Sequence, residues 1–265
     1  MKAKRGYKTK RQDGKAITHT QLADIDAIVT DFESVVGSMS DLFAKTDLTI
    51  AHTNGKHPFM RSSGGIYHSA ERTISVGVVV AGTPIRAGAH ELAHWLDAEA
   101  GSAMGASTRL RNKSGRRSYD STYLSEFVGS LENDPEDELL SDAWRTVNRV
   151  REAHQLFSRR IERTDERDRV RASLGPYWSR RCEIYARLVE QWLATRCETV
   201  CSAADSPEVY QRMPGWWTEA TFLELMSAVE KSVERRIDVL RGVSNNLRGQ
   251  TRTPEALASH SAHAE

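Results

Sequence analysis

The chain has 265 residues, with 37 Lys or Arg against 36 Asp or Glu, and its formal net charge of +1 argues against a general attraction to nucleic acids. Its length suffices for one domain with a sizeable hydrophobic core. No apolar stretch approaches the length of a membrane span, the N-terminus lacks the apolar core of a secretory signal, and the three cysteines form no paired motif. We therefore expect a reduced, cytoplasmic protein without membrane association.

The N-terminal segment differs from the rest of the chain in its basic composition. Its first 15 residues contain seven Lys or Arg and a single Asp. We expect residues 1–17 to be a basic disordered tail, which either has no partner or contacts phosphates through its charge. A single domain is expected over residues 18–247, and a second disordered tail over residues 248–265, where the apolar periodicity is lost.

Apolar residues recur with a helical period from Thr20 to Lys45, which predicts an amphipathic helix interrupted near Gly37. Residues 46–70 are rich in glycine and serine and are predicted to be irregular. The three histidines of this segment favour a loop with scattered imidazoles over a further metal site. They are His52, His57 and His68.

A strand followed directly by a helix is predicted in the next segment. Residues 72–80 are rich in β-branched side chains and end at a Gly- and Pro-containing turn, which is typical of a strand. Thr83 is a suitable N-cap and Pro84 a suitable first helical residue, so we expect a helix over residues 84–100.

This predicted helix carries the most informative motif of the chain, the sequence HELAH at residues 90–94. The spacing places the imidazoles of His90 and His94 one turn apart on one helix face, where both can bind one Zn²⁺. Glu91 would flank the metal as a general base. The alternative is a surface helix in which the motif arises by chance, but the neighbouring apolar residues indicate burial, and buried histidines need partners.

The strand before the motif has two alternative roles. In zinc peptidases of the HExxH type, such a strand forms the edge to which an extended substrate adds. The alternative is an ordinary core strand.

Two histidines need a third protein ligand in a catalytic zinc site. Asp97 follows His94 by three residues, a position better suited to hydrogen bonding an imidazole than to binding the metal. A solvated charge at the helix end is the alternative for Asp97. The third ligand is therefore expected farther along the chain.

The middle of the chain offers weaker candidates. The basic cluster at Arg109–Arg117 is expected to be a solvated loop, with phosphate contact as the alternative. A helix opening at Pro135 and continuing through residue 171 carries His154, a rival third ligand. Cys197 and Cys201 are spaced for a second metal site, but packing residues are the simpler interpretation.

A helix is also predicted from residue 177 to 193. Glu183, Ala186 and Glu190 share one face, on which the small Ala186 allows a second helix to approach closely, so that Glu183 can reach a metal. The alternative is a solvated face with a salt bridge from Glu183 to Arg187. The other face is packed, by Cys182, Tyr185, Val189 and Trp192.

Together these motifs resemble the large polyvalent protein-associated domain of phage and conjugative-element proteins, whose members resemble zincin-like metallopeptidases. The resemblance covers residues 66–240 and implies that Glu183 is the third ligand of a His-His-Glu site. It departs from the pattern at Tyr185, where the family usually has Phe, and at the 109–117 loop, which has no counterpart. The matching positions are His90, Glu91, His94 and Asp97, then Tyr177, Glu183, Ala186, Arg187 and Glu190.

The expected fold is therefore α+β and mostly helical, a zincin-like metallopeptidase domain with a small mixed sheet, an HExxH active-site helix and a final helix over residues 216–240. The expected ligands of Zn²⁺ are His90, His94 and Glu183, with Asp97 and Glu190 as hydrogen-bond partners of the imidazoles.

The expected reaction is hydrolysis of a protein or peptide substrate. Glu91 would act as general base and then general acid, and Tyr177 or Tyr185 would hydrogen-bond the oxyanion, although Tyr185 fits a core position better. The alternative is a zinc-containing counter-defence or binding module that engages host protein or DNA with little or no hydrolysis. In either case, delivery into a host cell together with phage or plasmid DNA is compatible with a cytoplasmic protein.

Overall fold

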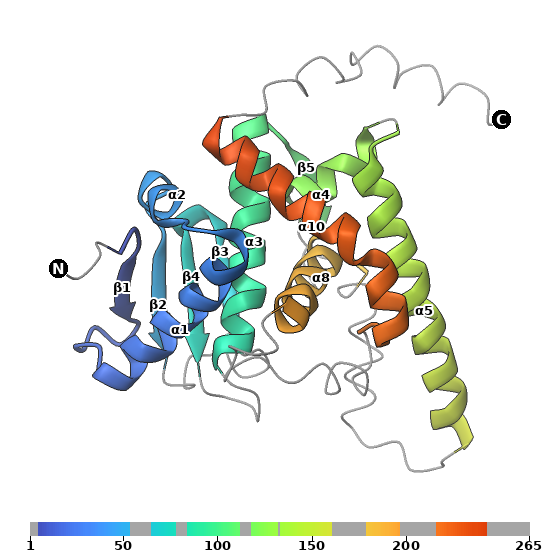
Figure 1. Cartoon of the computed structure of the whole chain (residues 1–265), viewed down its shortest axis with the longest axis horizontal. Helices are drawn as coiled ribbons and strands as arrows, with labels where there is room; N and C mark the ends of the chain where they lie inside the picture. Colours follow the sequence, from blue (N-terminus) through green and yellow to red (C-terminus); the bar gives the residue numbers. More distant parts are fainter. Residues whose placement is uncertain are drawn as a thin grey trace.

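The computed structural model describes residues 5–53, 65–77, 84–111, 118–131, 133–160, 179–196 and 216–242. Within these ranges, helices accompany a four-stranded mixed sheet and a separate two-stranded hairpin (Figure 1). The coarse class, α+β and mostly helical with a small mixed sheet, is therefore confirmed. Several predictions lie outside the described residues, namely those on His57, Tyr177, Cys197, Cys201 and residues 248–265.

The larger sheet has the strand order β1-β2-β4-β3. Strands β1, β2 and β4 run parallel, and β3 is antiparallel to β4. All five residues of β4 are buried, as expected for a β-branched strand between two neighbours. The core-strand alternative for residues 72–80 is thus confirmed for the described part, and the edge-strand role is wrong. The strands are β1 (Lys8–Arg11), β2 (Thr49–Thr53), β3 (Gly65–His68) and β4 (Thr73–Gly77).

Two predictions about the N-terminal part of the chain are wrong. The segment 1–17, predicted to be disordered, contributes β1 to the sheet, and the segment 46–70, predicted to be irregular, contributes β2 and β3. Each of these strands is four or five residues long and has little periodicity of its own. Their formation depends on pairing with strands distant in sequence, as in the register of Lys8 opposite Thr49.

Two helices follow the predicted pattern in the first part of the chain. Helix α1 (His19–Val36) begins with a capping box between Thr18 and Gln21 and ends at Gly37, whose φ of 79° disfavours other residues. Helix α2 (Ser40–Lys45) follows. The predicted interruption near Gly37 is therefore confirmed. The buried face of α1 packs into the core with Ile25, Ile28, Val29 and Phe32.

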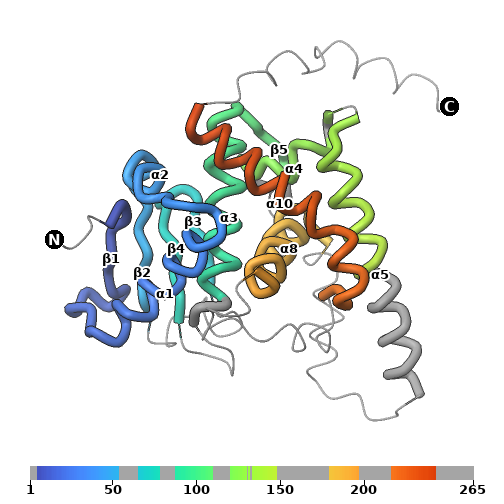
Figure 2. Tube along the Cα trace, viewed as in Figure 1, coloured from blue at the N-terminus to red at the C-terminus, as the bar shows by residue number. Residues whose placement is uncertain are grey.

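Helix α3 (Pro84–Met104) runs through the middle of the molecule, with the sheet on one side and the later helices on the other (Figure 2). Its residues from Glu91 to Gly101 are all buried. Gly88 allows α1 to approach, because a Cβ at this position would lie 2.3 Å from Cδ1 of Ile28. A helix this enclosed can hold polar side chains only if they have partners.

The second half of the chain covers the other side of α3 (Figure 1). Helix α8 packs along α3, and α10 crosses both helices and α5. Residues 109–111 of the basic segment belong to β5, so the predicted loop is wrong for them, and residues 112–117 lie outside the described ranges. The elements are β5 (Thr108–Arg111), β6 (Ser118–Ser121), α4 (Leu124–Phe127), α5 (Pro135–Arg160), α8 (Arg181–Arg196) and α10 (Glu219–Arg241), with short 3-10 turns at Ser69–Glu71 and Val128–Ser130.

None of the helices in the described ranges combines the length and the apolar character that crossing a lipid bilayer requires.

Candidate metal centre

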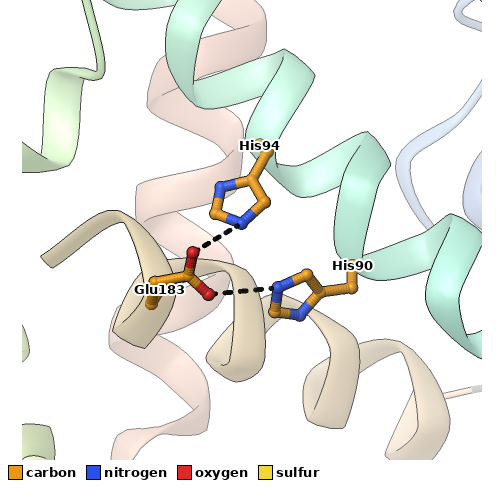
Figure 3. A group of neighbouring side chains, drawn as sticks. All are labelled: His90, His94 and Glu183. Carbon is orange, nitrogen blue, oxygen red and sulfur yellow. Dashed lines mark ion pairs between the residues drawn. The ribbon is translucent and has the colours of Figure 1, made fainter. Parts of the chain in front are cut away.

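Two helices bring together the three residues predicted to bind a metal. His90 and His94 lie one turn apart on α3, and Glu183 faces them from the first turn of α8 (Figure 3). The distance from His90 Nε2 to Glu183 Oε2 is 3.5 Å, and that from His94 Nε2 to Glu183 Oε1 is 3.7 Å. One ligand atom of each residue lies within 4.8 Å of the other two, and no other group of this kind occurs in the described ranges.

The packing of α8 explains how Glu183 reaches this position. Residues 182–194 of α8 are all buried, because the helix is enclosed by α3, α5 and α10. Ala186 is fully buried and lies one turn after Glu183. The interpretation of Glu183 as one half of a solvated salt bridge is wrong, since both Glu183 and Arg187 are buried.

Glu190 lies two turns after Glu183 and holds the His90 ring from its other nitrogen. The distance from His90 Nδ1 to Glu190 Oε2 is 3.1 Å. Burial alone would lower the pKa of His90, but the hydrogen bonds with Glu183 and Glu190 raise it to about 10. Without a metal, His90 is therefore protonated, with its Nδ1–H directed to Glu190 and its Nε2–H to Glu183. The predicted contact of Glu190 with an imidazole is present.

The charge of Glu183 depends on the two histidines. Burial alone would raise its pKa, but the nearby His94 and His90 hold that pKa well below its usual value. Glu183 is therefore an ionised carboxylate in a buried site.

Glu91 lies beside this group without joining it. Burial raises its pKa, and the charges of His94 and His90 together with a hydrogen bond from the Tyr67 backbone N–H oppose that rise. Strand β3 passes very close, because a Cβ at Gly65 would lie 2.7 Å from Glu91 Cγ. Only glycine at this position allows the edge strand to lie directly against the carboxylate.

Asp97 does not orient an imidazole, so that prediction is wrong. Its carboxylate accepts hydrogen bonds from the Ser125 backbone N–H at 2.9 Å and from Arg236 Nη2 at 2.7 Å. Asp97 and Arg236 are both fully buried. The alternative of a solvated helix-end charge is also wrong. His94 Nδ1 is buried and finds no hydrogen-bond partner in the part of the chain that the structure describes.

The candidate tyrosines fall into different places. Tyr185 is buried, with its ring centroid 3.8 Å from the Arg236 guanidinium carbon, so the core position expected for it is confirmed. Tyr177 lies outside the described residues.

Two other histidines were weighed as ligands. Strand β2 contains His52, whose Nδ1 is 3.2 Å from Gln21 Nε2 and which takes no part in the metal-binding group. His154 belongs to α5 at a position whose side chain is likewise outside the described part.

One residue near the centre was missed by the sequence analysis. Tyr123 precedes α4, and its ring centroid lies 5.5 Å from that of His94 at an interplanar angle of 54°. Burial raises the pKa of Tyr123 well above its usual value, and the nearby Cys182, Glu91 and Glu183 raise it further. No motif or periodicity marks this position in the sequence.

Comparisons of this chain with protein-family models, curated proteins and solved structures found no match. The resemblance to the polyvalent protein-associated domain therefore stays a prediction.

Proposed function

We propose that this chain is a zinc-dependent peptidase with a zincin-like centre. The observation that supports the proposal is the convergence of His90, His94 and Glu183 around one position, with Glu91 beside them and outside the ligand set. A phage or mobile-element setting belongs to the same proposal and is supported only by the sequence resemblance.

The residues present fit zinc. Two imidazole nitrogens and one carboxylate oxygen are ligands that zinc prefers, and three protein ligands are typical of a catalytic site with an open position. Ligands about 2.1 Å from a tetrahedral ion are about 3.4 Å from one another. The nitrogen-to-oxygen distances of 3.5 and 3.7 Å are close to that spacing.

When bound, zinc would polarise the substrate carbonyl and lower the pKa of water. Glu91 would then accept a proton from the attacking water while the water oxygen bonds to the carbonyl carbon. The same carboxyl would deliver that proton to the amide nitrogen as the carbon–nitrogen bond breaks. Burial of Glu91 raises its pKa, which favours both accepting and returning a proton near neutral pH.

Strand β3 is the edge of the sheet that lies beside Glu91. An extended peptide can bind to the edge of a sheet through main-chain hydrogen bonds. Gly65 keeps this edge close to Glu91, so a peptide bound alongside β3 would pass the three ligands. This edge strand takes the role that the sequence suggested for residues 72–80.

The alternative of a module that engages DNA depends on the basic segments. In the described ranges, several of these basic side chains already have acidic partners. Arg11 pairs with Asp13, and Arg109 with Asp120. These pairs reduce the charge available to phosphates, so the geometry favours the peptidase.

The test is cleavage of a proteome-derived peptide library by zinc-loaded protein, read by mass spectrometry. We expect Glu91→Gln to keep its zinc but to cleave roughly 10²–10⁴-fold more slowly, which is the usual contribution of general acid–base catalysis. Glu99→Gln is the matched control on α3, because Glu99 is also buried but hydrogen-bonds Tyr67 and Arg72 instead.

Wild-type protein and the Glu99→Gln variant should produce the same cleavage products, and removal of zinc with a chelator should abolish them. A wild type that holds one zinc yet produces no more cleavage than Glu91→Gln would overturn the peptidase proposal and favour the binding module.

A further inference from the structure

Tyr123 occupies a distinctive place next to the candidate metal centre. It lies between β6 and α4, is only partly buried, and its ring faces that of His94 at 5.5 Å. The two rings are tilted by 54° to one another, so Tyr123 lies against the imidazole of a proposed ligand. A side chain that contacts a proposed ligand and is still partly accessible can contact a bound substrate.

The segment around Tyr123 is held firmly against α3. A Cβ at Gly101 would lie 1.8 Å from the Thr122 carbonyl oxygen and 2.7 Å from the Leu124 nitrogen, so residues 122–124 rest directly on the helix. Two residues after Tyr123, the Ser125 backbone N–H and hydroxyl both donate hydrogen bonds to Asp97. Asp97 thus connects the helix that carries His94 to the start of α4.

The same segment is also attached to α8. Glu126 accepts a hydrogen bond at 3.1 Å from the backbone N–H of Cys182, the residue before Glu183. Tyr123 is therefore fixed relative to both helices that supply the ligands. Such fixed positioning is what a hydrogen-bond donor to a transition state requires.

We propose that Tyr123 is a catalytic residue whose hydroxyl donates a hydrogen bond to the oxygen anion that develops on the substrate carbonyl as water adds. This inference depends on the proposed peptidase function and assigns a further residue to its site. The phenol keeps its proton throughout, and its role is to stabilise negative charge.

Two other tyrosines in the described ranges are placed differently. The Tyr67 hydroxyl donates to Glu99 at 3.2 Å, and the Tyr185 ring packs against Arg236. Of the tyrosines in the described ranges, Tyr123 is the one whose ring contacts a proposed ligand.

The test compares Tyr123→Phe with Tyr7→Phe. The control removes a hydroxyl that donates to Asp26 at 2.7 Å, from a residue beside the distant strand β1. Tyr123→Phe keeps the ring against His94, so zinc content should stay at one per chain. With a peptide identified from the library, kcat should fall about 10²-fold while KM changes little, as expected for a lost oxyanion donor.

A second measurement needs no substrate. Acetohydroxamate binds active-site metals through its oxygen atoms, and its affinity for cobalt-loaded protein can be read from the visible spectrum. We expect roughly 10-fold weaker binding in Tyr123→Phe and unchanged binding in Tyr7→Phe, because one hydrogen bond to a charged oxygen is lost. Ser125→Ala, which loosens the attachment to Asp97, should weaken hydroxamate binding by a smaller factor.

Unchanged hydroxamate affinity and unchanged kcat in Tyr123→Phe would overturn the proposal, and so would loss of zinc from that variant, which would mark Tyr123 as structural. Failure of the peptidase function itself has a different outcome, because the wild type would then cleave no peptide while the hydroxamate comparison still tests the donor role.

Discussion

Two glutamates on α8 approach the same histidine but make different contacts. Glu183 faces Nε2 of both His90 and His94, whereas Glu190 contacts Nδ1 of His90. A metal bound between the Nε2 atoms would therefore have Glu183 as a ligand and Glu190 as the partner that orients the His90 ring. Zinc binding by single variants of Glu183 and Glu190 distinguishes these two roles.

Glu183→Ala should abolish stoichiometric zinc binding, because two remaining protein ligands form a weak site. Glu190→Gln should keep binding but weaken zinc affinity by about 10–100-fold, since the amide still reaches Nδ1 without a charge. Competition with a chromogenic chelator measures both affinities. Equal losses in the two variants would contradict the distinction between ligand and orienting partner.

The residues of the centre differ in how far the sequence could predict them. The spacing of His90, Glu91 and His94 is local, so the helical period was sufficient to place the two histidines on one face and Glu91 beside them. Glu183 needed a family resemblance as well, because no local rule connects two helices that are far apart in sequence. Tyr123 had no such signal, since its position depends on how α4 rests on α3.

At the level of elements, α10 is fixed to the centre of the fold by a buried charge. Arg236 donates to Asp97 on α3 at 2.7 Å and to both carboxylate oxygens of Glu136 on α5. The misassignment of Asp97 has its origin here, because a rule based on spacing along one helix cannot account for an arginine supplied by another. The Asp97 carboxylate therefore links α3 to α4 through Ser125 and to α10 through Arg236.

Arg236→Met should lower the free energy of unfolding by about 3–5 kcal/mol, because it removes the fully buried cation that Asp97 and Glu136 share. The neighbouring Arg235, which pairs with Asp134 at 2.9 Å and is partly exposed, provides the control. Its replacement by Met should cost less than Arg236→Met, because the Arg235 side chain is partly exposed whereas Arg236 is fully buried. Urea denaturation followed by circular dichroism measures both, and equal losses would show that burial of Arg236 is not decisive.

The elements themselves were predictable in proportion to their length. Helices α1, α3, α8 and α10 repeat apolar residues over four or more turns, and each was predicted close to its observed bounds. Strands β1, β2 and β3 have four or five residues and acquire their stability from partners distant in sequence. Composition alone therefore assigned them to a tail and a loop.

At the scale of the whole molecule, the candidate metal centre makes the stability of the protein depend on pH. The pKa of His90 is raised from 6.5 to about 10. In the metal-free protein, its contribution to the free energy of unfolding is therefore complete below pH 6.5 and is lost as the pH rises through about 10. The pKa of Glu183 is lowered from 4.5, so its contribution to the free energy of unfolding is present above pH 4.5 and is lost as the pH falls.

The metal-free protein should therefore be most stable between about pH 4.5 and 6.5, as measured by urea denaturation across that range. Zinc requires a neutral imidazole, so its binding near pH 7.5 should release about one proton from His90. Calorimetry in two buffers of different ionisation enthalpy measures that proton. His90→Ala removes both the site and the proton, and zinc binding without proton release in the wild type would show that His90 is already neutral.

The position of α3 between the sheet and the later helices also determines when the metal centre is completed during synthesis. The sheet and α3 come from the first part of the chain, whereas Glu183 is synthesised much later. Closing a loop of that length has an entropic cost that is repaid only when α8 packs. A chain still emerging from the ribosome would present His90 and His94 without the third ligand. The proposed hydrolytic activity would therefore begin only after α8 has been made and packed.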